Sequence, residues 1–226
     1  MRRPAVLVLT LALALTGCGG DDEKDRSQGP SSGDSASAPG GCEDAHAPAP
    51  GGEGGGHRPV RPLDAKKTYE VTMTTTCGSM TIRLDVKTSP TTTASFASLV
   101  RSGFYDKTLF HRIVPGFVIQ GGDPTGTGNG GPGYSTRDKP PPRTKYTKGV
   151  VAMAKTANQP AGTAGSQFYV VTGRDAGLPP QYALLGRVVK GMSTAERIDA
   201  LGDPQSGEVG QPLRPVVLKK ASLRVS

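Results

Sequence analysis

The 226-residue chain lacks several patterns that mark common functional classes. It has no extended basic run and no interleaving of basic with aromatic residues, so its net charge of +8 is spread out and nucleic-acid binding is disfavoured. His46, His57, Cys42 and the carboxylates near them could in principle bind a metal, but their spacing fits no zinc pattern. No apolar stretch is long enough to span a bilayer. We therefore expect no nucleic-acid partner, no metal and no cofactor.

The N-terminus has the features of an export signal. A positive start, MRRP, precedes an apolar run of 11 residues, 5–15, which is too short to span a bilayer. The run ends in LTGCGG, which resembles the lipobox of bacterial lipoproteins, where cleavage before the cysteine leaves a diacylglycerol-modified N-terminus. We predict that residues 1–17 are a signal peptide and that a lipid on Cys18 anchors the mature protein to the outer face of the cytoplasmic membrane. The alternative is an ordinary secretory cleavage site with an incidental cysteine.

A segment rich in glycine and proline follows the signal. Between residues 19 and 62, 17 of 44 residues are Gly or Pro, and aromatic residues are absent. Such a composition cannot form a core, so residues 18–65 are predicted to be a disordered tether between membrane and domain. The tether contains Cys42. An exported chain meets an oxidising compartment, where Cys42 and Cys77 can pair, but their sequence positions leave the pairing open.

The remaining residues, 66–226, carry the apolar patterns of a folded domain. The four apolar residues from Met80 to Val86 alternate with polar ones, which is the period of a half-buried strand. The stretch TYEVTMT, 68–74, alternates likewise, and Cys77–Gly78 offers a hairpin turn between the two. Further short apolar segments predict strands at 109–114, 117–120, 150–154, 167–171, 182–189 and 216–225.

Two helices are predicted from their end signals. Ser89 and Pro90 open the first, which Gly103 ends, and a capping box of Ser193 and Glu196 opens the second. Many short strands with only two helices indicate a barrel or sandwich rather than a parallel sheet.

Two apparent motifs fail on their context. GTGNGG, residues 126–131, matches the dinucleotide fingerprint, but Pro132 follows instead of a helix, so a surface loop is the better interpretation. Ser166, His111 and Asp123 suggest a hydrolase triad, yet AGSQF is not the GxSxG elbow. We expect His111 to be a buried histidine bonded to backbone.

The stretches FHRIVPGFVIQGGD, VVAMA, GSQFYV and LLGRVVKGM occur in an order and spacing that resemble the cyclophilins, the peptidyl-prolyl isomerase family. The resemblance covers about residues 68–226. It implies a mainly β fold, a closed eight-stranded antiparallel barrel capped by two α-helices. Such a barrel fills its interior with side chains, so the ligand groove is expected on the outside.

The resemblance also implies the site residues. The catalytic group would be Arg112 with Phe117 and Gln120, Gln120 orienting the arginine and the peptide. Phe117, Val118, Phe168 and Leu178 would wall a proline pocket. The other substrate-binding residues would be Ala154, Lys155, Gln167 and Tyr182.

Several positions depart from the common eukaryotic pattern. Val118 replaces a methionine, Lys155 an asparagine, Tyr169 a second phenylalanine, and Tyr182 stands where a histidine is common. The chain has no tryptophan, so the residue that contacts cyclosporin in sensitive members is missing near Gly177. The resemblance therefore predicts catalysis without predicting drug sensitivity.

The expected function is isomerisation of X-Pro bonds in exported proteins, by a monomer whose partners are proline-containing polypeptides. Rotation about a peptide bond has a barrier of about 18–20 kcal/mol, and no covalent bond is made or broken. An arginine at the edge of an apolar groove would stabilise the twisted amide more than either planar form. The alternative is a proline-peptide binding or chaperone module with vestigial activity.

Overall fold

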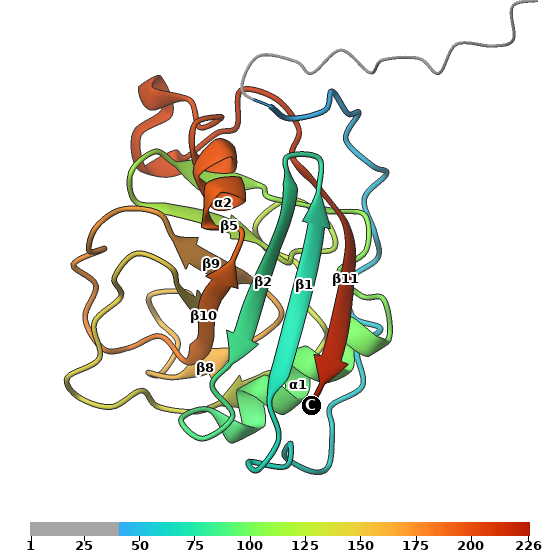
Figure 1. Cartoon of the computed structure of the whole chain (residues 1–226), viewed down its shortest axis with the longest axis vertical. Coiled ribbons are helices and arrows are strands. Elements are labelled where there is room, and N and C mark those ends of the chain that lie inside the picture. Colours follow the sequence, from blue (N-terminus) through green and yellow to red (C-terminus); the bar gives the residue numbers. More distant parts are fainter. Residues whose placement is uncertain (1–40) are drawn as a thin grey trace, which may run out of the picture. The chain divides into compact units, whose positions relative to one another are not determined.

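We describe residues 41–226 of a computed structural model of the chain (Figure 1). The predicted signal peptide, Cys18 and residues 18–40 of the predicted tether lie outside the described residues. The elements are β1 (Tyr69–Thr75), β2 (Gly78–Leu84), α1 (Pro90–Arg101), β3 (Thr108–Leu109), β4 (Arg112–Val114), β5 (Val118–Gly121), β6 (Thr136–Arg137), β7 (Val150–Met153), β8 (Thr163–Ala164), β9 (Phe168–Val171), β10 (Leu184–Lys190), α2 (Met192–Asp199), the 3-10 segment η1 (Pro204–Val209) and β11 (Val217–Val225).

Nine of the strands form one antiparallel sheet in the order β3-β11-β1-β2-β10-β7-β9-β5-β4, and β6 pairs with β8 separately. The two end strands are successive pieces of one segment, 108–114, interrupted at Phe110 and His111. The sheet therefore curls until its ends meet in that segment. The predicted mainly β fold is confirmed. The predicted closed eight-stranded barrel is wrong, because β3 and β4 pair with different neighbours, β11 and β5, and not with each other.

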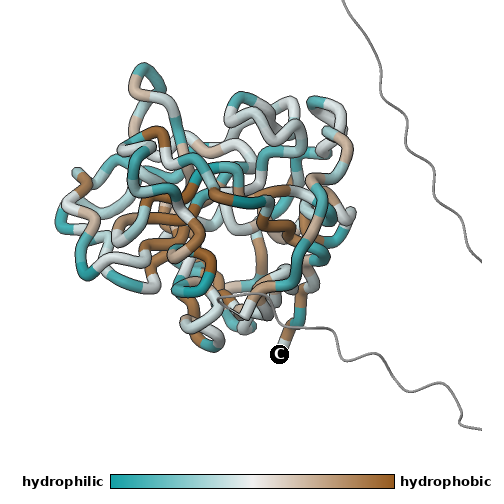
Figure 2. Tube along the Cα trace, turned by 90° about the horizontal axis from the view of Figure 1, so that it is seen from above, coloured by the Kyte–Doolittle hydropathy of each residue, from teal (hydrophilic) through white to brown (hydrophobic). Residues whose placement is uncertain are grey.

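The strands under the groove are buried on both faces. In β5, β7 and β9 successive residues alternate between two apolar clusters, because side chains along a strand point to opposite faces. Ile119, Val151 and Val170 belong to the main core inside the curl. Val118, Ala152 and Tyr169 belong to a smaller cluster on the outer face. Figure 2 shows apolar segments towards the middle of the trace and hydrophilic segments around its periphery.

Two helices pack on the sheet, as expected, and lie towards opposite ends of it (Figure 1). Helix α1 contacts β11 and β6, and α2 contacts β2 and β5. Ser89 and Pro90 open α1 as predicted, although the Ser89 side chain makes no capping bond. The predicted capping box of α2 is wrong: the N-cap is Gly191 at φ 75°, and Ser193 already lies inside the helix.

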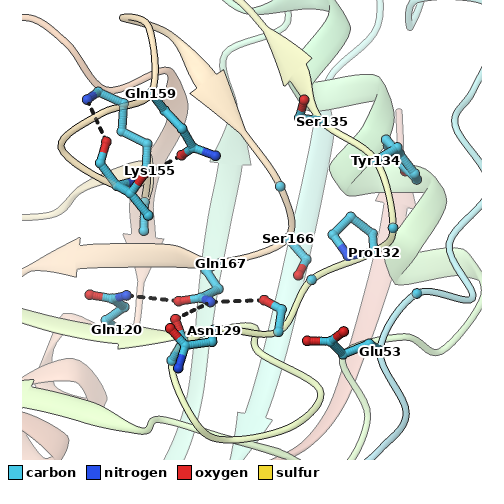
Figure 3. Close-up of a pocket in the computed structure, with 18 residues that line it drawn as sticks. Glu53, Gln120, Asn129, Pro132, Tyr134, Ser135, Lys155, Gln159, Ser166 and Gln167 are labelled. Carbon is cyan, nitrogen blue, oxygen red and sulfur yellow. Dashed lines mark hydrogen bonds between the residues drawn. The ribbon is translucent and has the colours of Figure 1, made fainter.

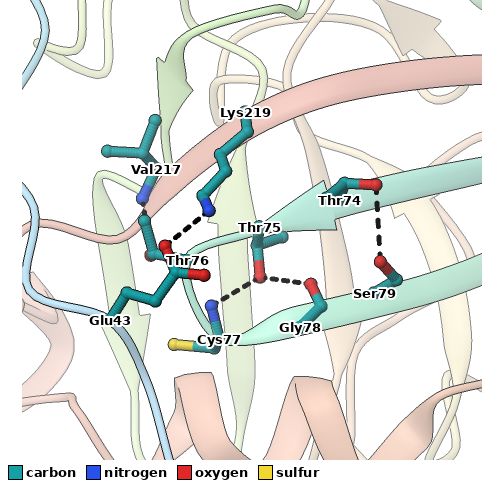
Figure 4. Close-up of polar contacts among 9 residues, drawn as sticks. All are labelled: Glu43, Thr74, Thr75, Thr76, Cys77, Gly78, Ser79, Val217 and Lys219. Carbon is teal, nitrogen blue, oxygen red and sulfur yellow. Dashed lines mark hydrogen bonds and ion pairs between the residues drawn. The ribbon is translucent and has the colours of Figure 1, made fainter. Parts of the chain in front are cut away.

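The described part of the predicted tether, 41–65, has no helix or strand but is held against the domain. Cys42 is buried and forms a disulfide with Cys77 in the β1–β2 turn, which resolves the pairing that the sequence left open. The Glu43 amide donates to the Thr76 carbonyl, 2.7 Å, and the Glu43 carboxylate pairs with Lys219 (Figure 4). A disulfide closing a loop of this size stabilises a fold by about 3–4 kcal/mol.

Among the described residues, no helix combines the length and the apolar character needed to cross a membrane.

Candidate active site

A pocket of about 290 Å³ lies on the outer face of β5, β7 and β9, above the smaller apolar cluster. We call it the proline pocket. Its lining combines apolar and aromatic side chains with a few polar ones, namely Arg112, Phe117, Val118, Gln120, Ala154, Lys155, Tyr169, Leu178 and Tyr182. Eight of the ten residues predicted for the site therefore lie in one pocket.

The predicted position of Phe168 in the pocket wall is wrong. Phe168 is fully buried in the main core, where its ring packs edge-on against Phe96 and Phe110. The next residue, Tyr169, faces the pocket instead. The error is one residue along a strand, and a shift of one residue moves a side chain to the opposite face.

Arg112 stands at the pocket rim with its guanidinium held from two sides. Its Nε and one terminal nitrogen donate to the Glu208 carbonyl oxygen at 3.0 and 2.9 Å, and the other terminal nitrogen donates to Gln120 Oε1 at 3.4 Å. The carbonyl comes from η1, 96 residues along the chain, and no local signal predicts it. Of the five N–H donors of a guanidinium, two remain for a ligand.

The Gln120 amide is itself oriented by Gln167. Gln120 and Arg112 face each other across the β4–β5 pair, and Gln120 Nε2 donates to Gln167 Oε1 at 3.0 Å. Gln167 Nε2 in turn donates to the carbonyls of Gly128 and Gly130, each at 2.9 Å. The predicted groove residue Gln167 thus lies behind Gln120, and the chain of hydrogen bonds fixes which end of each amide faces its neighbour.

The glycine-rich loop wraps around the buried carboxylate of Asp123. That carboxylate accepts hydrogen bonds from the Thr125 hydroxyl and from the backbone amides of Thr125, Gly128 and Gly130, at 2.6–3.2 Å. Gly130 admits no side chain, because a Cβ would lie 2.2 Å from Asp123 Oδ1. The loop that matches GxGxxG therefore donates its amides to the Asp123 carboxylate, and its carbonyls accept hydrogen bonds from Gln167.

The hydrolase triad is not assembled. Ser166 is buried and its hydroxyl donates to the Gly122 carbonyl at 2.7 Å, while the Asp123 carboxylate is engaged by the loop. The two ring nitrogens of His111 are buried, as expected, and neither makes a hydrogen bond of good geometry among the described residues. The Leu109 backbone and the Gln167 side chain nevertheless lie close enough to the ring to raise its pKa.

Phe117 is positioned by the C-terminal end of α2. The Asp199 carboxylate accepts from the Gly116 amide at 3.0 Å and from the Thr172 hydroxyl at 2.6 Å, which ties the turn before Phe117 to the end of β9. The Phe117 carbonyl accepts from the Thr172 amide at 3.0 Å. These hydrogen bonds fix the turn that carries Phe117, whose side chain lines the pocket.

Tyr169 and Tyr182 line the pocket, and Tyr146 packs behind them in the smaller apolar cluster. Tyr182 packs nearly perpendicular to Tyr146 and Tyr169, and Lys155 Nζ lies 5.5 Å from the Tyr182 ring centre. The Tyr146 hydroxyl donates to the Tyr182 carbonyl at 2.7 Å and accepts from the Tyr182 amide, and burial raises the pKa of Tyr146 to about 12. Burial also raises the pKa of Tyr169. The hydroxyls of Tyr146 and Tyr169 therefore stay neutral near pH 7.

Charge at the site comes mainly from Arg112. Burial lowers the pKa of its guanidinium from the ordinary value, and Glu208 and Tyr182 oppose that effect. An arginine in a protein nonetheless remains protonated throughout the physiological range. Burial also lowers the pKa of His111 from 6.5, against the opposing influence of the Asp123 carboxylate. His111 is therefore neutral at pH 7 and adds no charge beside Arg112.

These two pKa shifts predict different responses to pH. We expect turnover to change little between pH 6 and 8, because no group at the pocket has to gain or lose a proton there. Stability should fall below about pH 6.5, since the unfolded chain then binds a proton at His111 that the folded chain does not. Turnover at each pH, with the thermal midpoint at pH 7.5 and 5.5, checks both. A one-proton rise or fall in turnover of the folded enzyme would implicate His111 and contradict this assignment.

A second pocket of about 400 Å³ adjoins the first and shares Gln120, Ala154 and Lys155 with it. Figure 3 shows Gln120 and Gln167 at one side of this pocket, Lys155 and Gln159 at another, and Glu53 opposite them. Glu53 comes from residues 18–65, the segment predicted to be a tether.

Comparisons with known proteins agree with this geometry. Residues 70–223 match the family model of cyclophilin type peptidyl-prolyl cis-trans isomerases. Peptidyl-prolyl cis-trans isomerase-like 1 of Gibberella zeae is 39% identical over 158 residues, 68% of this chain and 94% of the relative. The human protein of the same name is 37% identical over 164 residues, 71% of this chain and 95% of the relative.

The fold has a solved counterpart as well. A cyclophilin type isomerase of Cryptosporidium parvum, crystallised in the presence of the dipeptide Ala-Pro, superposes with a TM-score of 0.62 at 31% identity, covering 69% of this chain and 98% of that one. The chain belongs to the cyclophilin-type peptidyl-prolyl cis-trans isomerases. It is an enzyme, and the family assignment favours catalysis over the alternative of a binding module.

Proposed function

We propose that this isomerase works by stabilising a twisted X-Pro amide with Arg112 at the rim of the proline pocket. When the amide twists, conjugation is lost and the prolyl nitrogen becomes pyramidal and basic. A hydrogen-bond donor aimed at that nitrogen is then favourable, whereas in the planar amide the nitrogen accepts poorly. Only such a difference between twisted and planar forms accelerates rotation.

The observation that carries the proposal is the way Arg112 is held. The Glu208 carbonyl and Gln120 use three of its donors, so the fork is oriented before a peptide arrives and little side-chain entropy is lost on binding. The two remaining N–H groups can meet the prolyl nitrogen and the neighbouring carbonyl. Such pre-oriented donors contribute most where charge develops in a site that excludes water.

The apolar part of the pocket has a separate role. Phe117, Val118 and Leu178 offer a surface without hydrogen-bonding groups, which suits the ring of a proline. Gripping the ring while the rest of the peptide rotates leaves the amide as the bond that turns. Burial of an apolar ring also removes water that would compete for the donors of Arg112.

We further propose that the clients are exported proteins and that the enzyme is a lipoprotein on the outer face of the cytoplasmic membrane. Support comes from the leader-like start of the sequence and from LTGCGG around Cys18. The Cys42–Cys77 disulfide is also typical of proteins that fold in an oxidising compartment. The family match begins at residue 70, after the segment on which this proposal rests.

Cys18→Ser should release the protein from the membrane fraction or leave it unprocessed, because the atom that receives the lipid is gone. Fractionation of cells, with intact mass of the recovered protein, measures both outcomes. Ser27→Ala, nine residues further along, is the matched control and should leave the protein membrane-bound. A Cys18→Ser protein that is membrane-bound and processed like the wild type would overturn the lipoprotein proposal.

A further inference from the structure

The second pocket has a wall that the family match does not cover. Residues 51–57 run beside the loop 124–134, and three of their amides donate to that loop: Gly51 to the Pro124 carbonyl at 2.8 Å, Gly54 to Gly131 at 3.0 Å and Gly56 to Pro132 at 3.2 Å. The segment is therefore docked on both sides of Glu53.

The glycines of this segment permit its close approach. A Cβ on Gly56 would lie 2.8 Å from Pro132 Cβ and 3.0 Å from Leu99 Cδ2, so a larger residue would lift the segment away. The Tyr134 hydroxyl donates to the His57 carbonyl at 3.4 Å on the far side. A glycine-rich composition is typical of a flexible tether, but it also lets residues 51–57 pack closely against the loop 124–134.

Glu53 is the one acidic residue among the described residues that line the second pocket. Figure 3 shows its carboxylate turned towards the pocket, opposite Gln159 and Lys155. Within residues 41–226 that carboxylate makes no hydrogen bond or ion pair. Lys155 is the one basic lining residue, and its Nζ is engaged by the Thr156 carbonyl at 3.1 Å and lies over Tyr182. The negative end of the pocket is therefore unneutralised.

The lining residues that the two pockets share indicate which client residue would reach Glu53. Both pockets border Gln120, Ala154 and Lys155, so one extended peptide can cross this strip with its proline in the first pocket. In an extended chain, side chains two residues apart point to the same side. The residue two positions from the proline then points into the second pocket.

We propose that Glu53 makes the second pocket selective for a cationic side chain, Lys or Arg, two residues from the isomerised proline. This inference rests on the placement of the proline in the first pocket. The general charge of the protein works in the opposite direction, because a chain of net charge +8 attracts acidic peptides at long range. A preference for lysine would therefore come from the nearby Glu53 carboxylate and not from the net charge of the protein.

The experiment compares peptides that contain one Ala-Pro bond and carry Lys or Glu two residues before or two residues after the proline. Catalysed exchange is measured by NMR at substoichiometric enzyme, so no coupling protease biases the comparison. At one of the two positions the wild type should favour Lys over Glu by about fivefold, the size expected when attraction and repulsion by one solvated carboxylate are added. The preference should shrink at high salt.

The variants isolate Glu53 from the net charge. Glu53→Gln should reduce the preference to about twofold or less, and Glu53→Lys should invert it. Glu43→Gln is the matched control. It also removes one negative charge from residues 41–65, but Glu43 pairs with Lys219, so this variant should retain the preference for Lys. Equal turnover of the Lys and Glu peptides by the wild type, or an equal loss of preference in Glu43→Gln and Glu53→Gln, would overturn the proposal. A wild type that turned over no peptide would instead contradict the placement of the proline.

Discussion

Arg112→Ala is expected to lower isomerase turnover more than a hundredfold while the domain remains folded. The side chain lies at the pocket rim, half-buried, and contributes little to either apolar cluster. Its loss removes both donors that face the amide. If those donors stabilise the twisted amide by about 3 kcal/mol, the rate should fall by somewhat more than a factor of 100.

Arg112→Lys should fail almost as badly. Lysine keeps the charge, but its compact ammonium cannot bind the Glu208 carbonyl and Gln120 while also presenting two donors to the peptide. Turnover of an X-Pro peptide by each purified variant, with circular dichroism to confirm the fold, measures the effect. Arg83→Ala is the matched control, because Arg83 is an exposed arginine on β2 that pairs with Glu70. Near-normal turnover by either Arg112 variant would show that Arg112 has no role in catalysis.

The largest effect on stability is expected from Asp123→Ala. The buried carboxylate accepts four hydrogen bonds from the loop 125–130, and their loss leaves three backbone amides without a partner. Hydrogen bonds to a charged group contribute about 1.5–3 kcal/mol each, and part of this is recovered by water, so the free energy of unfolding should fall by about 3 kcal/mol. Turnover should fall too, because the loop carbonyls that orient Gln167 lose their support.

The same carboxylate predicts an acid dependence. Burial alone would raise the pKa of Asp123, but the hydrogen bonds from Thr125, Gly130 and Gly128 outweigh it and lower the pKa below 3.8. The stabilisation by a group whose folded pKa is depressed is present above the unfolded pKa and is lost as the pH falls through the folded value. Asp123→Ala should therefore lose less stability than the wild type between pH 5 and 2.

Graded variants separate the carboxylate from a general packing defect. Thr125→Val removes one hydroxyl donor and keeps the volume, so it should cost about 1 kcal/mol. Asp123→Asn keeps one acceptor oxygen and should lie between Thr125→Val and Asp123→Ala. Denaturant midpoints at pH 7 rank the three variants. An Asp123→Ala protein as stable as the wild type would contradict the role given to the carboxylate.

The sequence predicts the local parts of this molecule better than the long-range ones. Strict alternation from Met80 to Val86 locates β2, and Ser89 with Pro90 locates the start of α1, because these signals are carried by neighbouring residues. The same period of two could have predicted the position of Tyr169. If Gln167 lies on the groove side of its strand, Phe168 points into the core and Tyr169 points outward.

The rest depends on contacts between distant segments. Arg112 donates to the carbonyl of Glu208, which is 96 residues away in the sequence, and no local pattern in either segment predicts this hydrogen bond. Glycine-rich composition is the same for a free tether and for a strip of backbone docked against a loop, so residues 51–57 could not be distinguished by composition. The break at Phe110 and His111, which divides one predicted strand into β3 and β4, likewise follows from pairing with two different neighbours.

The most direct test of the central claim compares binding with catalysis for one peptide. The affinity of an X-Pro peptide for wild type and Arg112→Ala is measured by titration, and the exchange rate at saturating peptide is measured by NMR. If Arg112 stabilises the twisted amide in preference to the planar one, the dissociation constant should change by less than about threefold while the saturated rate falls more than a hundredfold. A dissociation constant that rises a hundredfold with an unchanged saturated rate would show that Arg112 only holds the peptide, and would contradict the mechanism.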